Sequence, residues 1–207
     1  MSAREEILER ARRALRDVPS SAPADDVPFV RPEPATGPAT PAQVDRFAER
    51  VADYRAVVER VADGHVAERV RAAVGGLRRI VVPSGLPAEL VPDGVVVVRD
   101  GPDVPVGELD RCDGVVSTAA LGIATTGTIV LDHGAGQGRR AATLVPDLHV
   151  CVVRTDQVVA GVPEAVAALD PSRPQTWISG PSATSDIELD RVEGVHGPRA
   201  LHVLLVG

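Results

Sequence analysis

The sequence has no lysine and very few aromatic side chains. All 22 basic residues are arginine, which excludes a Schiff-base lysine and the lysine of a phosphate-binding P-loop. Aromatic residues make up only 2% of the 207 residues, so valine, alanine and leucine must form the core. This composition favours parallel strands covered by helices, and the length suits one such domain.

Cysteine is equally scarce. Cys112 and Cys151 are the only two, and neither has a C-x-x-C partner or a histidine at a metal-finger spacing. We therefore expect two reduced, buried thiols and not a disulfide or an iron–sulfur ligand set. Because no His/Asp/Glu cluster has metal-ligand spacing and no nucleophile elbow is present, we predict no metal site and no cofactor of the chain's own.

The charge and the apolar runs exclude two classes of partner. A formal net charge of −7 gives no general attraction to nucleic acid. No apolar run reaches the length needed to cross a bilayer, and the first residues lead into an amphipathic, charged pattern unlike a signal peptide. We therefore predict a cytoplasmic protein without a nucleic-acid or membrane partner.

The first half of the chain shows a helical period interrupted by proline. Residues 18–41 are rich in Pro, Ala and Asp, which indicates an extended linker or arm. We predict an N-terminal helix and proline-rich arm over residues 1–40, followed by an α/β domain over residues 41–207. The expected helices cover residues 2–17, 41 to about 64, and 66–76.

Beyond Gly76 the period changes to that of strands alternating with short helices. This alternation implies right-handed crossovers and a largely parallel sheet flanked by helices. The predicted strands around Val115 and Ile129 lie close together in the sequence, which predicts at least one antiparallel or irregular piece in the sheet. The expected strands are 79–83, 95–98, 113–117, 128–132, 148–154, 177–178 and 201–206, and the expected short helices are 87–90 and 163–169.

The densest polar segment lies between the last two predicted strands. It runs Gly180-Pro181-Ser182-Ala183-Thr184-Ser185-Asp186-Ile187-Glu188 and is followed by Gly194-Val195-His196-Gly197-Pro198. A glycine-hinged polar loop that leaves a buried strand is where α/β proteins place their chemistry. We predict Asp186 and His196 as catalytic residues, because histidine titrates near neutrality, with Ser182 and Glu188 binding substrate. The alternative is that Asp186 and His196 only form hydrogen bonds that hold the loop in place.

A second polar segment surrounds Gly127. Thr126, Gly127 and Thr128 are predicted to bind substrate, since glycine permits a nest of backbone N–H groups close to a ligand oxygen. The alternative is a tight turn whose threonines suit strands. Because both polar segments flank predicted strands, we expect them to converge at one end of the sheet.

A glycine-rich stretch, Gly134–Arg140, ends in two arginines. Its glycine spacing does not match a dinucleotide-binding fingerprint. It is either a mobile flap whose Arg139 binds an anionic substrate, or a solvated loop. We expect the neighbouring His133 to be a surface histidine and His202 to be structural.

The two polar segments also carry a family resemblance. Ile123-Ala124-Thr125-Thr126-Gly127-Thr128-Ile129-Val130-Leu131, together with the Gly-Pro-Ser, Asp-Ile-Glu and Gly-Val-His-Gly-Pro motifs above, resembles the LutC/YkgG family of LUD-domain proteins. This chain departs from the family motif at Thr125, where relatives usually have glutamate. The resemblance implies a NagB/RpiA/CoA-transferase-like α/β fold with an N-terminal helical extension.

The resemblance also implies a function. Members of this family act with iron–sulfur partner proteins in the oxidation of L-lactate to pyruvate. The chain's own contribution would be to bind a small carboxylate or to hold the partners together. One alternative is a free-standing enzyme on a CoA-transferase or sugar-phosphate-isomerase-like scaffold, although Thr125 counts against carboxylate-based acyl transfer there. The other is a noncatalytic interaction module, which the proline-rich arm favours.

Overall fold

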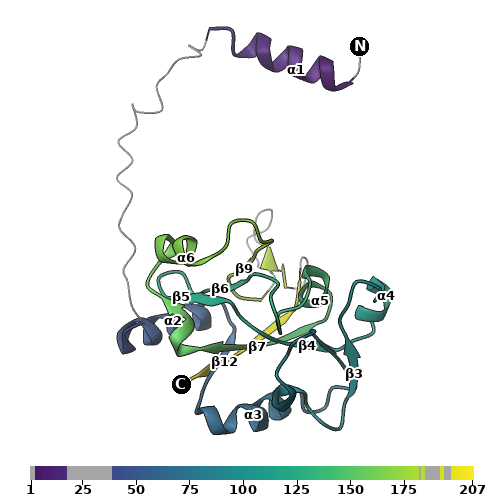
Figure 1. Ribbon diagram of the computed structural model, residues 1–207, viewed down its shortest axis with the longest axis vertical. Coiled ribbons are helices and arrows are strands. Elements are labelled where there is room, and N and C mark those ends of the chain that lie inside the picture. The colour runs from purple at the N-terminus through teal and green to yellow at the C-terminus, as the bar shows by residue number, and fades with distance from the viewer. Residues whose placement is uncertain (1–2, 18–38, 182, 185–191, 194–196) are drawn as a thin grey trace. The chain divides into compact units, whose positions relative to one another are not determined.

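The computed structural model describes residues 3–17, 39–181, 183–184, 192–193 and 197–207 (Figure 1). The chain divides into two compact units, Met1–Glu33 and Pro34–Gly207. In the first unit, α1 (Ala3–Ala14) has acidic residues in its first turn and basic residues in its last, the order that the helix dipole favours. The predicted N-terminal helix is confirmed, whereas most of the predicted arm lies outside the described residues.

The second unit begins with α2 (Pro41–Asp53), which has a complete N-terminal cap. The backbone N–H of Gln43 donates to Thr40 Oγ1 at 3.3 Å, and the Thr40 N–H donates to Gln43 Oε1 at 2.8 Å. The prediction that this helix continues to residue 64 is wrong. Arg55 has a φ of 67°, which ends the helix, and β1 (Val57–Val61) follows. Pairing with a neighbouring strand outweighs the helical spacing of these valines.

A six-stranded parallel sheet forms the centre of the unit. Its strand order is β1-β12-β7-β4-β2-β3, and all five pairings are parallel, so the predicted α/β fold with a largely parallel sheet is confirmed. The additional strands are β2 (Arg79–Val82), β3 (Val96–Arg99), β4 (Gly114–Thr118), β7 (Leu148–Arg154) and β12 (Ala200–Val206).

Each face of this sheet is covered by apolar side chains from other elements. On one face, Val70 of α3 (Val66–Ala73) packs in a cluster with Ile80 and Val150. On the other face, α2 and a second sheet cover Val203 and Leu205. Figure 1 shows α3 and the second sheet on opposite sides of the parallel sheet. The short helices are η2 (Asp63–His65), η3 (Ala88–Leu90), α4 (Val106–Leu109), α5 (Arg140–Leu144) and η4 (Thr155–Gln157).

The second sheet has the order β8-β5-β6-β9 and mixed directions. β5 and β6 are antiparallel, which confirms the predicted antiparallel piece. The predicted strands 128–132 and 177–178 do form, but they belong to this sheet and not to the parallel one. α6 (Val162–Ala168) packs against its outer face through Ala165. The strands are β5 (Leu121–Ile123), β6 (Thr128–Leu131), β8 (Val158–Val159) and β9 (Thr176–Ile178); β10 (Ala183–Thr184) and β11 (Val192–Glu193) form a separate antiparallel pair.

Among the described residues, no helix is both long enough and apolar enough to cross a bilayer.

Candidate functional site

The order of the parallel strands reverses between β2 and β4. From β2 the chain continues to β3 at one edge of the sheet, whereas from β4 it continues to β7 on the other side. Connections that leave adjacent strands in opposite directions open a crevice at the carboxyl ends of those strands. In open α/β sheets this is the preferred place for a ligand site.

The glycine-rich stretch is packed into this crevice. The Gly136 N–H donates to the Ser84 carbonyl at 2.9 Å, and the Gly136 carbonyl accepts from the Thr118 N–H at 2.9 Å. One glycine therefore bridges the ends of β2 and β4. Its φ is 76°, and an added Cβ would lie 2.8 Å from Thr118 Oγ1, so a side chain does not fit there. The stretch is thus hydrogen-bonded to the carboxyl ends of β2 and β4 and is not a solvated loop.

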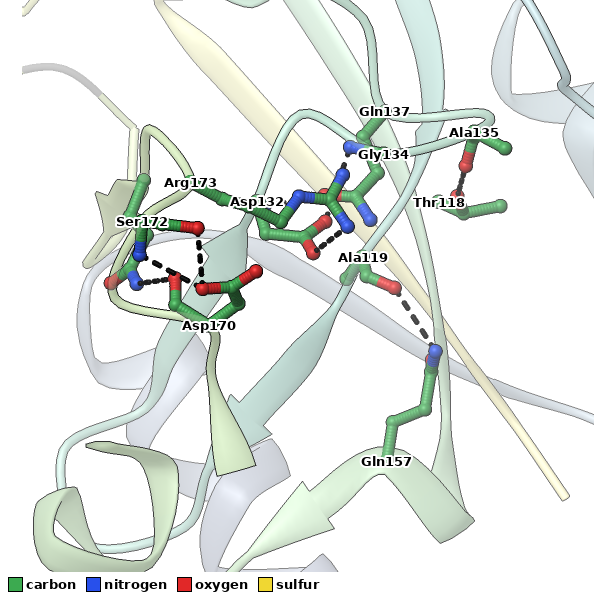
Figure 2. Close-up of polar contacts among 11 residues, drawn as sticks. Thr118, Ala119, Asp132, Gly134, Ala135, Gln137, Gln157, Asp170, Ser172 and Arg173 are labelled. Atoms are coloured by element: carbon green, nitrogen blue, oxygen red, sulfur yellow. Dashed lines mark hydrogen bonds and ion pairs between the residues drawn. The ribbon is translucent and has the colours of Figure 1, made fainter. Parts of the chain in front are cut away.

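A cleft of about 790 Å³ opens beside this bridge, and we call it the switch cleft. Its volume lies in the range of small-molecule sites. The polar residues that line it lie at or after the ends of strands and helices. Thr118 ends β4, Asp132 and Gln137 follow β6, Gln157 follows β7, and Asp170 and Arg173 follow α6 (Figure 2). Asp156, beside Gln157, also lines the cleft.

An ion pair lies at the centre of the cleft wall. Arg173 Nη1 lies 2.9 Å from Asp132 Oδ2, and the side chains are 42% and 17% exposed, respectively. Asp132 Oδ1 also accepts from the Gly134 N–H at 3.1 Å, and the Asp132 N–H donates to Gln137 Oε1 at 2.6 Å (Figure 2). The carboxylate is therefore fixed by the backbone, while much of the guanidinium remains open to solvent.

The turn that carries Arg173 is stabilised from within. Asp170 Oδ1 accepts from the Ser172 hydroxyl at 2.7 Å and from the Ser172 N–H at 2.9 Å. These two bonds lower the pKa of Asp170, the hydroxyl more than the N–H, and keep its carboxylate ionised. The Arg173 N–H closes the turn on the Asp170 carbonyl at 3.2 Å.

Gln157 joins the other wall of the cleft to the sheet. Its Nε2 donates to the Ala119 carbonyl at 3.0 Å (Figure 2). Its Oε1 accepts from the Arg154 N–H at 2.9 Å. The amide thus connects the ends of β4 and β7. Among the described residues that line the cleft, Arg173 is the single cation, against the carboxylates of Asp132, Asp156 and Asp170. This set suits a small polar ligand that carries both an anionic group and a hydrogen-bond donor.

The predicted substrate-binding residues Thr126, Gly127 and Thr128 lie at the turn between β5 and β6. The hydroxyls of Thr126 and Thr128 are 2.7 Å apart, and Thr128 Oγ1 lies 2.9 Å from Ser179 Oγ. The switch cleft is lined instead by Leu121 and Asp132, at the opposite end of this hairpin. The three residues are therefore outside the cleft, and their role in binding stays a prediction.

Glycines of both polar segments lie against α2. At Gly127, where φ is 64°, an added Cβ would lie 2.6 Å from the Arg50 carbonyl carbon. At Gly180, where φ is 82°, it would lie 2.3 Å from Tyr54 Cβ. Both positions exclude a side chain because α2 approaches the backbone there. Close helix packing thus accounts for these glycines.

Four predicted site residues, Ser182, Asp186, Glu188 and His196, lie outside the described residues. Their catalytic and substrate-binding roles stay predictions, as does the convergence of the two polar segments. Ser179, three residues before Ser182, is described and lies 2.9 Å from Thr128 through the two hydroxyl oxygens.

Arg139, the predicted anion-binding arginine, pairs with Asp100. Its Nε lies 2.7 Å from Asp100 Oδ1, its backbone N–H donates to Asp100 Oδ2 at 3.0 Å, and its guanidinium also donates to the Val104 carbonyl. Anion binding by Arg139 stays a prediction. His133 is not the surface histidine expected: it is half-buried, with Nδ1 2.7 Å from the Gly138 carbonyl and Nε2 3.0 Å from Thr176 Oγ1.

A buried serine–histidine pair lies between β4 and β7. Ser117 Oγ is 2.7 Å from His149 Nε2 and donates to Cys151 Sγ at 3.7 Å. Burial lowers the pKa of His149 to about 4 and raises the pKa of Cys151 to about 12. Both therefore remain neutral near pH 7, and the cysteine is not an activated nucleophile. Cys112 and Cys151 are both free and buried, as predicted.

The sequence interpretation missed the polar residues of the switch cleft. Asp132 is the last residue of the predicted strand 128–132 and Gln157 follows the predicted strand 148–154 by three residues, so the rule used for the other polar segments would have found them. Arg173 gave no such signal, because it lies in a proline-containing turn before β9 and not after the carboxyl end of a strand. Within the described part of the chain, no group of three or more His, Cys, Asp or Glu residues could hold a metal ion.

The fold and the cleft define an α/β protein with a ligand-type crevice at the switch point of a parallel sheet. Residues 107–206 match the family model of the LUD domain. The chain is 49% identical over 181 residues to lactate utilization protein C of Deinococcus radiodurans, which covers 85% of each protein. It is 31% identical over 96 residues to YkgG of Escherichia coli, covering 42% of this chain and 41% of that protein.

A solved structure extends this similarity to three dimensions. The crystal structure of a DUF162 family protein from Deinococcus radiodurans superposes with a TM-score of 0.69 at 40% identity, covering 82% of this chain and 100% of that one. The chain therefore belongs to the LutC/YkgG family of LUD-domain proteins, as its motifs predicted.

Proposed function

We propose that this chain is a component of an L-lactate utilisation system and acts with iron–sulfur partner proteins in the oxidation of lactate to pyruvate. The observation that carries the proposal is the 49% identity, over 85% of both chains, to a protein named for lactate utilisation. The chain's own contribution is to bind a small carboxylate. The single guanidinium of the switch cleft supports this part of the proposal.

The chemistry supports a division of labour with partners. Oxidation of lactate removes two electrons and therefore requires an acceptor. An iron–sulfur cluster needs several cysteine thiolates. This chain has two cysteines, both buried, and burial raises the pKa of Cys151 to about 12. We therefore assign the cluster chemistry to the partners.

The proposal extends to the scaffold. We infer a NagB/RpiA/CoA-transferase-like domain over residues 41–207, preceded by a helix and arm over residues 1–40, in a cytoplasmic protein. The all-parallel sheet with a switch point supports the comparison with that fold class. Such scaffolds host several unrelated activities, so the function is argued from the family and the cleft and not from the fold.

Reconstitution tests the proposed function. The isolated chain and the chain mixed with its iron–sulfur partners are assayed for lactate-dependent reduction of a dye. We expect turnover only in the mixture. Asp186→Ala and His196→Ala should lower that activity while circular dichroism remains unchanged. Turnover by the isolated chain would contradict the proposal and support a free-standing enzyme.

A further inference from the structure

The switch cleft combines one guanidinium with carboxylates in a way that selects a ligand class. We propose that it binds a small 2-hydroxycarboxylate, with Arg173 binding the carboxylate and Asp170 accepting a hydrogen bond from the hydroxyl. The inference rests on the proposed function, because it places carboxylate binding at a particular site. It assigns that binding to residues outside the family motifs.

Arg173 is placed to bind an anion without moving. Asp132 holds it through Nη1 at 2.9 Å and is itself fixed by the Gly134 N–H. A guanidinium has five N–H donors, so with Asp132 as its ion-pair partner among the described residues, this partly exposed, cleft-lining side chain has further donors for a ligand. Asp132 is therefore a positioning residue that keeps the guanidinium fork facing the cleft.

The carboxylates around Arg173 determine which anions fit. A simple carboxylate is attracted by Arg173 but repelled by Asp132 and Asp170, so these charges oppose its binding. A ligand hydroxyl changes this balance, because it donates a hydrogen bond to a carboxylate and satisfies it. Both bonds from Ser172 go to Asp170 Oδ1, which leaves Oδ2 as an acceptor in the described part of the site (Figure 2).

The same geometry discriminates between lactate, the substrate of the proposed oxidation, and pyruvate, its product. A 2-oxo acid has a carbonyl in place of the hydroxyl and cannot donate, so its oxygen would face a carboxylate without a shared proton. Because Asp170 is exposed, the preference comes from one hydrogen bond at the surface of the cleft and is modest. The cleft is therefore expected to bind the hydroxy acid more tightly than the oxo acid.

Calorimetric titration of the isolated, full-length chain tests the proposal with three probes of similar size. L-lactate carries a hydroxyl donor, pyruvate a carbonyl and propionate neither. We expect lactate to bind about 2- to 10-fold more tightly than the other two, the effect of one hydrogen bond to an exposed carboxylate. Equal binding of the three, or no binding of lactate, would overturn the assignment.

Variants test the residue roles. Arg173→Gln should raise the Kd for lactate about 10- to 100-fold, and Arg173→Lys should restore part of the loss, because it keeps the charge without the fork. Asp170→Asn should reduce the preference for lactate over pyruvate. Arg199→Gln is the matched control. Arg199 forms an exposed ion pair with Asp147 at the amino ends of β12 and β7, whereas the cleft lies at the carboxyl ends of the strands.

The outcomes separate this inference from the proposed function. If lactate binds and Arg173→Gln binds it as wild type does, the site assignment is wrong while the reconstitution result stands. If the variant loses binding but keeps its melting temperature, the assignment is supported. Absence of activity with the partners would refute the proposed function without changing the binding data.

Discussion

Acid should destabilise this protein through one buried histidine. Burial lowers the pKa of His149 from 6.5 to about 4 in the folded state, whereas the unfolded chain titrates near 6.5. Between these values the unfolded state binds more protons, so the free energy of unfolding falls as the pH falls. His149 contributes fully above pH 6.5, and its contribution decreases by about 1.4 kcal/mol for each pH unit below that value.

The expected loss is large enough to measure. Between pH 7.5 and pH 5 it amounts to about 2 kcal/mol, from about 1.5 units below the unfolded pKa of 6.5. Urea denaturation at a series of pH values gives this slope directly. His149→Gln retains a polar side chain beside Ser117 but does not titrate, so its stability should change less over this range.

Comparison with His149→Gln removes the contribution of groups that titrate equally in both proteins. The backbone N–H groups of Arg79 and Arg78 lower the pKa of Asp113, and Ser172 lowers that of Asp170, so both titrate below this interval. An equal slope in wild type and His149→Gln would show that the histidine is hydrated in the folded state, and the argument from burial would fail.

Three further predictions concern packing, charge and metal content. Gly127→Ala should cost about 2 kcal/mol or more in urea denaturation, because its φ is 64° and Arg50 blocks a Cβ, whereas Gly107→Ala, with open space around it, should be neutral or stabilising. Arg139→Ala should cost about 2 kcal/mol, since it leaves the buried Asp100 without its partner, while Arg199→Ala should change stability by less than about 0.5 kcal/mol. The purified chain should be colourless; elemental analysis that finds about one iron or zinc per chain after chelation would contradict the interpretation of its cysteines.

The strand pattern of the second half was predictable because buried β-branched runs alternate with short helices and turns. The segment Val57–Val61 was not, because its valines fit the helical spacing of the preceding residues equally well. Its structure is decided by β12, which lies more than a hundred residues away and pairs with it. Assignment of strands to two sheets also depends on such long-range pairing, which a local period does not encode.

The site was predictable only in part. The positions of Asp132 and Gln157 near strand ends indicate a site. The ion pair between Asp132 and Arg173 could not be predicted, because no periodic pattern in the sequence relates the two segments. Gly127 illustrates the opposite case. The sequence left open a ligand site and a tight turn there, and the structure places Gly127 in a turn where an added Cβ would meet Arg50 of α2, while ligand binding stays a prediction. A glycine motif alone does not distinguish a ligand from a helix as the group that comes close.

The position of β12 has a consequence for biosynthesis. β12 lies between β1 and β7, so the strand nearest the start of this unit cannot join the sheet until residues 200–206 have left the ribosome. Until then β1 has no partner, and β7 presents an open edge that can pair with other chains. Loss of these residues would remove an internal strand and separate β1 from the rest of the sheet, which makes the C-terminal segment a requirement for assembly and not a dispensable tail.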